Sequence, residues 1–224
     1  MATNRRKNSK DRQKKQAGRN IGSKPGEKEA VGLRVIGGQL RGSKLQYSGD
    51  NRVRPMKDRT REAVFNLIST ASKGKHVVDL FAGTGALAIE ALSRGAISAT
   101  LIETHLATMR NLRSNIESLA LVDCCRLVQA DAFYMARTPT ELRLPSDLPW
   151  LVFCSPPYHF YAEKQTEMLE MLQFLYDNAP NDSVFVIEAD NRFDFGLLPL
   201  VEENDLRRRS YPPAEIGVYR KFGV

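Results

Sequence analysis

Short apolar runs alternate with segments of helical periodicity from residue 76 to residue 188 of this 224-residue chain. Such runs predict buried strands, and apolar residues recurring every three or four positions predict helices packed on one face. Strands that alternate with helices form a mostly parallel sheet covered on both faces. We therefore expect an α/β fold with strands at 76–81, 99–103, 126–129, 151–154, 184–188, 206–211 and 216–222, and helices at 86–94, 105–119 and 162–176.

The first 56 residues follow a different pattern. Residues 33–38 and 44–47 predict two short strands joined by a glycine-rich turn, so we expect a small N-terminal β module over 31–56, ahead of a main domain over 57–224. A helix predicted at 57–71 opens the main domain, and its apolar spacing leaves Arg59 and Arg61 free to face away from the core. Three prolines without periodicity predict a surface loop at 138–149.

Positive charge is concentrated in the first quarter of the chain. Residues 1–30 carry a net charge of +7 and residues 31–61 a net charge of +6, whereas residues 62–224 carry −6. Residues 1–30 hold too few apolar side chains to offset the entropy of ordering, so we expect a disordered basic arm. Two roles remain open for it: a solubilising tail or localisation signal, and a nucleic-acid-binding arm that exchanges counterions for phosphates.

Several protein classes are excluded by composition. Three cysteines, with Cys124 and Cys125 adjacent, cannot build a disulfide framework or a four-ligand zinc site, which favours a reducing compartment. No stretch approaches the roughly 20 apolar residues of a membrane span, and no apolar segment follows the basic N-terminus. His105 and His159 lack partners at metal-ligand spacing. We expect a cytoplasmic chain, acting as a monomer, with no metal and no membrane contact.

Polar or special residues follow four of the predicted strands. In an open α/β sheet, ligands bind beyond the carboxyl ends of the strands, so these positions are the candidates for a site. Two glycines in the first group let the backbone pass close to a ligand, and the acids in the second and third can accept from a ribose and from an adenine amino group. The four groups are Asp79 to Gly85, Glu103, Asp131, and Ser155-Pro156-Pro157-Tyr158.

The first two groups alone fit two kinds of cofactor. Gly83-Thr84-Gly85 followed by Ala88 matches the loose dinucleotide fingerprint G-x-G-x-x-A, so a nicotinamide-dependent oxidoreductase is one interpretation. The carboxylate of Asp79, close to the phosphate position, would repel pyrophosphate but suit the cationic end of a methionine-derived cofactor. The dinucleotide interpretation also assigns no role to residues 155–158.

Each of these side chains has a structural interpretation as well. Asp79 could cap loop amides, Glu103 could be a solvated strand end, and Asp131 could cap the short helix that follows it. Tyr158 could pack on the core rather than on a base. Cys154 invites comparison with enzymes that use a thiolate, but its place inside an apolar run indicates a buried, inert thiol.

The two motifs together resemble a known class of enzyme. Asp79 to Gly85 with Ser155-Pro156-Pro157-Tyr158 resembles S-adenosylmethionine-dependent methyltransferases that act on exocyclic amino nitrogens and carry a D/N/S-P-P-Y/F/W motif. The preceding block, including Gly37-Gly38, Arg54-Pro55 and Arg61-Glu62, is similar to the RsmD-type 16S rRNA guanine-N2 methyltransferases. This resemblance implies a Rossmann-like, seven-stranded sheet with a terminal antiparallel strand, and methyl transfer to guanine N2 in small-subunit rRNA.

The resemblance also implies roles for individual residues. Ser155 and the carbonyl of Pro156 would accept hydrogen bonds from the target amine and turn its lone pair toward the methyl group, while Tyr158 would stack on the base. Relatives with Asp in place of Ser155 are expected to hold the amine with that carboxylate, which this chain lacks. The implied cofactor-binding residues are Asp79, Phe81, Ala82, Gly83, Gly85, Glu103, Asp131, Ala132 and Ser155.

We expect the partner to be ribosomal RNA or the assembling small ribosomal subunit. Arginines on or beside the N-terminal module precede the pocket and would contact phosphates at fixed positions. The alternative is a non-catalytic RNA- or ribosome-binding protein on the same fold, which Ser155 and the basic arm would also suit. The candidate RNA-binding residues are Arg34, Arg41, Arg52, Arg54, Arg59 and Arg61.

Overall fold

The computed structural model describes residues 32–47, 49, 55–198 and 206–222. The predicted arm at 1–30 and the candidates Arg52 and Arg54 lie outside the described residues. Within them, seven strands form one sheet in the order β3-β2-β1-β4-β5-β7-β6. The strands are β1 (His76–Asp79), β2 (Ser98–Ile102), β3 (Cys125–Val128), β4 (Trp150–Cys154), β5 (Val184–Asp190), β6 (Arg207–Tyr211) and β7 (Ala214–Arg220).

The directions of the strands agree with the predicted sheet. Neighbouring strands from β3 across to β5 are parallel. Strand β7 inserts between β5 and β6 and is antiparallel to both. The prediction of a Rossmann-like, mostly parallel sheet with an antiparallel end is therefore confirmed, and five strands point their carboxyl ends toward the same edge.

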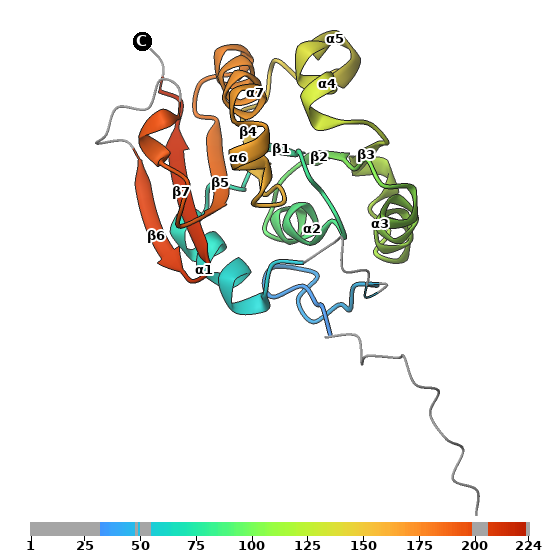
Figure 1. Ribbon diagram of the computed structural model, residues 1–224. Helices are drawn as coiled ribbons and strands as arrows, with labels where there is room; N and C mark the ends of the chain where they lie inside the picture. The colour runs from blue at the N-terminus through green and yellow to red at the C-terminus, as the bar shows by residue number, and fades with distance from the viewer. Residues whose placement is uncertain (1–31, 48, 50–54, 199–205, 223–224) are drawn as a thin grey trace, which may run out of the picture.

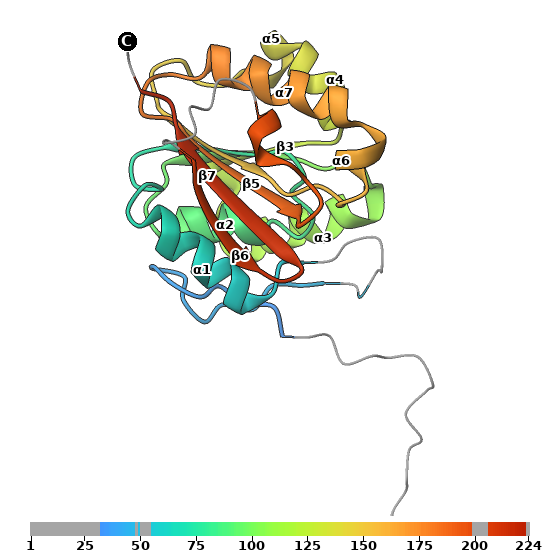
Figure 2. The same cartoon turned by 60° about the vertical axis from the view of Figure 1, so that its left-hand side comes forward.

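Helices cover both faces of this sheet (Figures 1 and 2). One face carries α1 (Asp58–Ile68), α2 (Ala86–Ser93) and α3 (Leu106–Ser118), and the other carries α4 (Ala132–Arg137), α5 (Pro139–Leu142), α6 (Phe160–Glu163) and α7 (Gln165–Asn178). Short 3₁₀ helices occupy Val122–Cys124 and Phe195–Leu197. Among the helices in the described ranges, none has the length and apolar character needed to cross a membrane.

The central strands are held by apolar packing on both sides. Every residue of β1, β4 and β5 is buried, as expected for strands that read as near-continuous apolar runs. On the α1 face, the rings of Phe65 and Phe153 lie 5.9 Å apart. On the opposite face, the rings of Phe185 and Tyr219 stack at 4.9 Å. The carboxyl edge of the sheet is consequently a rigid support for any side chains that extend from it.

Two predicted segments differ from the structure. The helix predicted at 162–176 is divided into α6 and α7 at Lys164, whose backbone leaves helical geometry and whose ammonium lies 4.8 Å and 4.9 Å from the ring centroids of Phe133 and Phe160. The loop predicted at 138–149 contains α5. Arg126 donates to the terminal carbonyls of that helix and Leu142 is fully buried, so tertiary contacts support a helix that shows no periodicity.

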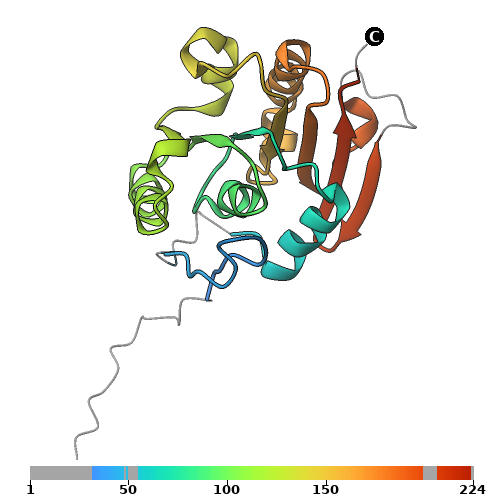
Figure 3. The same ribbon diagram turned by 180° about the vertical axis from the view of Figure 1, so that it is seen from behind.

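The N-terminal segment at residues 32–47 packs beneath α2 (Figure 3). The two predicted strands form one isolated β-bridge, between Arg34 and Lys44, and the backbone N–H of Leu45 donates to the carbonyl of Leu33 at 2.8 Å. The backbone N–H groups of Ile36 and Gly37 donate to the carboxylate of Glu90 on α2, at 2.7 Å and 2.8 Å. They are therefore not available for hydrogen bonds between two strands. The segment shares the core of the α1 and α2 face through Leu33, Val35 and Leu45.

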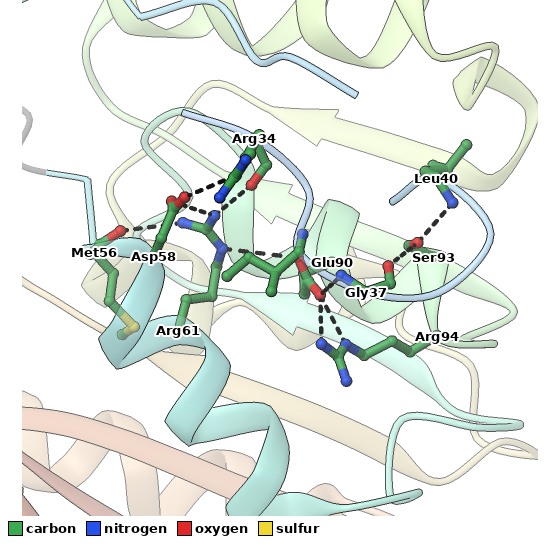
Figure 4. A network of polar contacts seen from close by, with 10 residues as sticks. Arg34, Gly37, Leu40, Met56, Asp58, Arg61, Glu90, Ser93 and Arg94 are labelled. Carbon is green, nitrogen blue, oxygen red and sulfur yellow. Dashed lines mark hydrogen bonds and ion pairs between the residues drawn. The ribbon is translucent and has the colours of Figure 1, made fainter. Parts of the chain in front are cut away.

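A buried ionic network fixes this arrangement (Figure 4). Glu90 is fully buried, accepts from Arg94 at 2.8 Å, and lies 3.8 Å from the guanidinium of Arg61, which is also fully buried. Arg61 in turn donates to the backbone carbonyl of Arg34 and to the carboxylate of Asp58. The network joins α1, α2 and the N-terminal segment, and so holds the segment in one position relative to the sheet.

Candidate active site

The polar groups predicted at the strand ends come together at the carboxyl edge of the sheet. Asp79 is the last residue of β1, which lies between β2 and β4. Glu103 directly follows β2, and Ser155 directly follows β4. The register between β4 and β5 places Glu188 level with Ser155. One edge therefore presents three carboxyl groups and a hydroxyl from four adjacent strands.

Asp79 is the most unusual of these groups, because its carboxyl is 1% exposed. Burial raises the pKa of Asp79 to about 7, with a further rise from the Glu103 carboxylate, against the lowering effect of the Phe81 and Ala88 backbone N–H groups. Within the described residues, neither carboxylate oxygen makes a hydrogen bond of normal geometry. A buried carboxyl without a partner suits a site that accepts a cation or a charged donor.

The loop after β1 turns sharply at its glycines. Gly83 and Gly85 both have positive φ angles, 53° and 81°. At Gly85 a side chain would also meet Leu112, since a Cβ there would lie 2.5 Å from its Cδ1 atom. The glycine at 85 is thus required by backbone conformation and by packing on α3. The backbone N–H of Ala82, which is buried, donates to the carbonyl of Ile102 and keeps the loop beside β2.

Glu103 braces the same loop. One carboxylate oxygen accepts from the backbone N–H of Gly83 at 3.0 Å, and the other accepts from that of His105 at 2.7 Å. Each carboxylate oxygen has two lone pairs, so both retain the capacity to accept from a ligand hydroxyl. The carboxylate of Glu103 is therefore oriented by the protein before any ligand is present.

The third strand end contains Asp131 and Ala132. Asp131 is exposed and caps α4, because its carboxylate accepts from the backbone N–H of Phe133 at 2.8 Å. This confirms the capping interpretation, and the predicted contact with an adenine stays a prediction. Ala132 is buried, and the Phe133 ring packs 5.9 Å from Phe81 and 5.8 Å from Phe160. These three rings form an apolar wall beside the edge.

The fourth strand end joins residues 155–158 to a residue that the sequence analysis did not single out. Ser155 donates to one carboxylate oxygen of Glu188, and Tyr158 donates to the other at 2.8 Å. Pro156 is buried and Pro157 is exposed. Glu188 stands at the end of a predicted strand, so its position at a polar strand end was the available signal.

Two further buried residues lie beside these groups, one predicted and one not. Cys154 is fully buried, as predicted, and burial raises the pKa of its thiol to about 12, which disfavours the reactive thiolate. Asn115 on α3 was not predicted: it is fully buried, exchanges hydrogen bonds with the backbone of Gln46, and donates to the carbonyl of Thr84 at 2.9 Å. A buried amide on an apolar helix face thus links the N-terminal segment to the glycine loop.

The candidate RNA-binding arginines divide into two groups. Arg34 is 65% exposed at its side chain, although it lies 3.4 Å from Asp58, and Arg41 and Arg59 are also exposed. Arg61 is fully buried in the network around Glu90, so the prediction that it contacts RNA is wrong. Helical spacing placed Arg61 off the apolar stripe of α1, but in the structure its guanidinium points inward, toward Glu90 on α2 and the backbone carbonyl of Arg34. Across the described ranges, no group of three or more metal-ligating side chains comes together.

Several known proteins are similar to this chain in sequence and in fold. The ribosomal RNA small subunit methyltransferase D of Escherichia coli K12 is 34% identical over 182 residues, which are 81% of this chain and 85% of that protein. The protein of the same name from Haemophilus influenzae is 33% identical over 150 residues, 66% of this chain and 75% of that protein.

A solved structure gives the same result. The "Putative methyltransferase yhhF" of Escherichia coli superimposes with a TM-score of 0.67 at 30% identity, over 85% of this chain and 98% of that one. A family model described as "Conserved hypothetical protein 95" matches residues 33–208. The chain therefore belongs to the conserved hypothetical protein 95 family, together with the ribosomal RNA small subunit methyltransferases D.

Proposed function

We propose that this protein transfers a methyl group from S-adenosylmethionine to the exocyclic N2 of a guanine in small-subunit ribosomal RNA. The observation that carries the proposal is the pairing of β1 with β4, which brings the Asp79 loop and the Ser155-Pro156-Pro157-Tyr158 motif to one edge. Membership of the family supports the reaction, since its named relatives are ribosomal RNA small subunit methyltransferases. We expect the protein to act as a monomer in the cytoplasm, where small subunits assemble.

The residues at this edge fit S-adenosylmethionine. Asp79 offers a buried carboxyl without a partner, which suits the ammonium of the methionine moiety, and Glu103 offers oriented oxygens for the ribose hydroxyls. The aromatic wall of Phe81, Phe133 and Phe160 suits an adenine. Bound S-adenosylmethionine supplies an electrophilic methyl group. The same carboxyl of Asp79 disfavours a dinucleotide, whose pyrophosphate it would repel.

The catalytic motif suits an amine with a delocalised lone pair. A guanine amine becomes a better nucleophile when acceptors hold its hydrogens and turn the lone pair toward the methyl group. Pro156 and Pro157 lack N–H donors, so their backbone presents acceptors alone. Tyr158, whose hydroxyl donates to Glu188 at 2.8 Å, would stack on the base. No strong general base is required, because a methylated amine readily loses its proton to water.

The N-terminal segment suits contact with the RNA backbone. Arg34, Arg41 and Arg59 are exposed, and the buried network around Glu90 holds their supporting segments in place. These arginines would position the RNA through its phosphates, while the pocket selects the base. The predicted basic arm at 1–30 would add counterion release, which raises affinity for all RNAs alike.

The test is methylation with an isotopically labelled methyl donor. The purified protein is incubated with labelled S-adenosylmethionine and either free 16S rRNA or partly assembled small subunits, and the digested RNA is mapped by mass spectrometry. We expect N2-methylguanosine at one position, and loss of the label with Ser155→Ala. Label on another base would contradict the guanine assignment. Absence of label together with no calorimetric binding of S-adenosylhomocysteine would contradict the function as a whole.

A further inference from the structure

We infer that Glu188 is a positioning residue for methyl transfer, which orients the Ser155 and Tyr158 hydroxyls and supplies the negative charge missing from the motif. This inference rests on the proposed function. The motif itself, Ser155-Pro156-Pro157-Tyr158, contains no charged side chain. The fold places a carboxylate from the neighbouring strand against that serine instead.

The geometry begins with the register of two parallel strands. Cys154 on β4 pairs with Ile187 on β5, so Ser155, the first residue after β4, lies level with Glu188, which is still within β5. Ser155 donates to one carboxylate oxygen of Glu188, and the Tyr158 hydroxyl donates to the other at 2.8 Å. The backbone carbonyl of Glu188 accepts from the buried Tyr161 hydroxyl at 2.9 Å, which holds the strand end itself. Two hydroxyl groups therefore hold the carboxylate, one on each oxygen, and a third holds the backbone of the same residue.

These hydrogen bonds determine the polarity of Ser155. A serine hydroxyl has one proton and two lone pairs, and it normally rotates to suit its surroundings. A carboxylate accepts only, so Ser155 must direct its proton to Glu188 and present lone pairs to the pocket. An oxygen that donates to a carboxylate is also a stronger acceptor, because chains of hydrogen bonds polarise one another. Glu188 thus turns a neutral hydroxyl into an oriented acceptor for an amine hydrogen.

The carboxylate of Glu188 has different partners from the carboxylate of Asp190, which lies on the same strand. Asp190, two residues further along the same strand, pairs with the Arg192 guanidinium. Glu188 is 9% exposed and takes part in none of the described ion pairs. Neutral hydroxyl donors hold it without neutralising it. The negative charge therefore acts on the pocket, where a nitrogen gains positive charge as it takes up a methyl group.

The first experiment removes the charge with little change of shape. In Glu188→Gln, the amide can donate to Ser155 and so reverse the orientation of its hydroxyl. We expect the single-turnover rate of RNA methylation to fall about 10- to 100-fold, the range for loss of a charge-assisted hydrogen bond. The dissociation constant of S-adenosylhomocysteine, measured by calorimetry, should stay within twofold. Tyr158→Phe, which keeps the ring, should show a smaller fall of the same kind.

A matched control lies on the next strand. Glu215 on β7 is the register partner of Ala189, so it projects from the opposite face of the sheet to Glu188. Glu215→Gln should leave both the rate and the dissociation constant unchanged. Equal rates for Glu188→Gln and the wild type would overturn the inference. A lower rate accompanied by an equal loss of S-adenosylhomocysteine affinity would also overturn it, because that result indicates general disorder of the pocket.

A rescue experiment separates positioning from a structural role. Ser155→Asp in the wild-type background sets two carboxylates against each other, so we expect a lower rate than the wild type. Combined with Glu188→Gln, the new carboxylate gains an amide donor, and the rate should recover at least tenfold relative to Glu188→Gln alone. Failure of the double variant to exceed both single variants would overturn the inference, even if Glu188→Gln were less stable.

The two proposals fail in distinguishable ways. If the wild-type protein neither binds S-adenosylhomocysteine nor methylates guanine in rRNA, the proposed function fails and the inference fails with it. If the wild type methylates guanine and the Glu188 variants behave as their controls do, the inference about Glu188 alone fails. The wild-type assay is therefore run first, on the same RNA and at the same salt concentration.

Discussion

Glu90 and Asp79 both carry buried carboxyl groups and lie on consecutive elements, but they differ in how many hydrogen-bond partners the protein gives them. Glu90 is fully buried, accepts from two backbone N–H groups and Arg94, and lies beside Arg61. Asp79 is almost as inaccessible, but its carboxylate makes no hydrogen bond of normal geometry within the described residues, and its pKa is raised to about 7.

The difference separates a structural charge from a functional one. A buried ion whose partners all belong to the protein is satisfied as soon as the chain folds. A buried carboxyl without partners lowers stability until something else supplies a donor or a positive charge. We therefore interpret Glu90 as the anchor of the N-terminal segment and Asp79 as a group reserved for the cofactor. Each prediction below can break or sharpen that distinction.

The largest effect is expected at Glu90. Glu90→Gln removes the fully buried one of the two carboxylates beside the Arg61 guanidinium, leaving only Asp58, and weakens the hydrogen bonds that Ile36 and Gly37 donate. The free energy of unfolding should fall by about 3–5 kcal/mol in urea titrations. Glu62→Gln, an exposed change on α1, should stay within about 0.5 kcal/mol. A decrease of less than about 1 kcal/mol in the free energy of unfolding of Glu90→Gln would contradict the interpretation of Glu90 as an anchor.

At Asp79 the same kind of substitution should have the reverse consequence for stability. At pH 8 an ionised carboxylate is buried without a partner, so Asp79→Asn should leave the free energy of unfolding unchanged or raise it. Affinity for S-adenosylmethionine should fall by about 1.5–3 kcal/mol, as a charge-assisted hydrogen bond is lost. Calorimetry and urea titration check the two halves. Marked destabilisation with unchanged affinity would show that Asp79 is a second structural anchor.

The raised pKa of Asp79 adds a pH dependence of intermediate size. The pKa of Asp79 is raised from the ordinary 3.8 to about 7 in the folded protein. The resulting contribution to stability is fully present below pH 3.8 and is lost as the pH rises through about 7. The cationic cofactor requires the carboxylate. Its affinity should therefore weaken up to about tenfold for each pH unit below 7 and level off above it.

Calorimetry across a pH series, in buffers of different ionisation enthalpy, measures this effect. Wild-type protein should release up to one proton on binding near pH 6, and Asp79→Asn should release correspondingly less. The difference between the two proteins removes the contribution of groups on the ligand itself. Identical pH profiles for the two proteins would contradict the assignment of the proton to Asp79.

The smallest effect is expected at Arg59, the exposed neighbour of the buried Arg61 on α1. Arg59→Gln should change the free energy of unfolding by no more than about 0.5 kcal/mol. The slope of log affinity for RNA against log salt should flatten by about 0.7–0.9, the value for one phosphate contact. Arg137→Gln, an exposed change on the opposite face of the sheet, is the control. Equal slopes for the two variants would exclude a specific contact at Arg59.

Local patterns in the sequence determined the elements and the edge at which the site lies. Apolar runs and helical spacing depend on neighbours within a few residues, so the seven strands of the sheet and helices α1, α2 and α3 were predicted to within a few residues of their observed bounds. Because parallel strands share one carboxyl edge, the sequence was enough to predict that Asp79, Glu103 and Ser155 lie at the same edge, although it did not give their contacts.

The tertiary structure decided which polar groups meet and which face outward. Ser155 contacts Glu188 only because of the register between β4 and β5, and Arg61 is buried where α1 meets Glu90 of α2 and the backbone of Arg34. The two strands expected in the N-terminal segment were reduced to one bridge because Glu90 takes up the N–H groups of Ile36 and Gly37. Register, helix rotation and competition for hydrogen bonds depend on residues distant in the chain, and no local pattern records them.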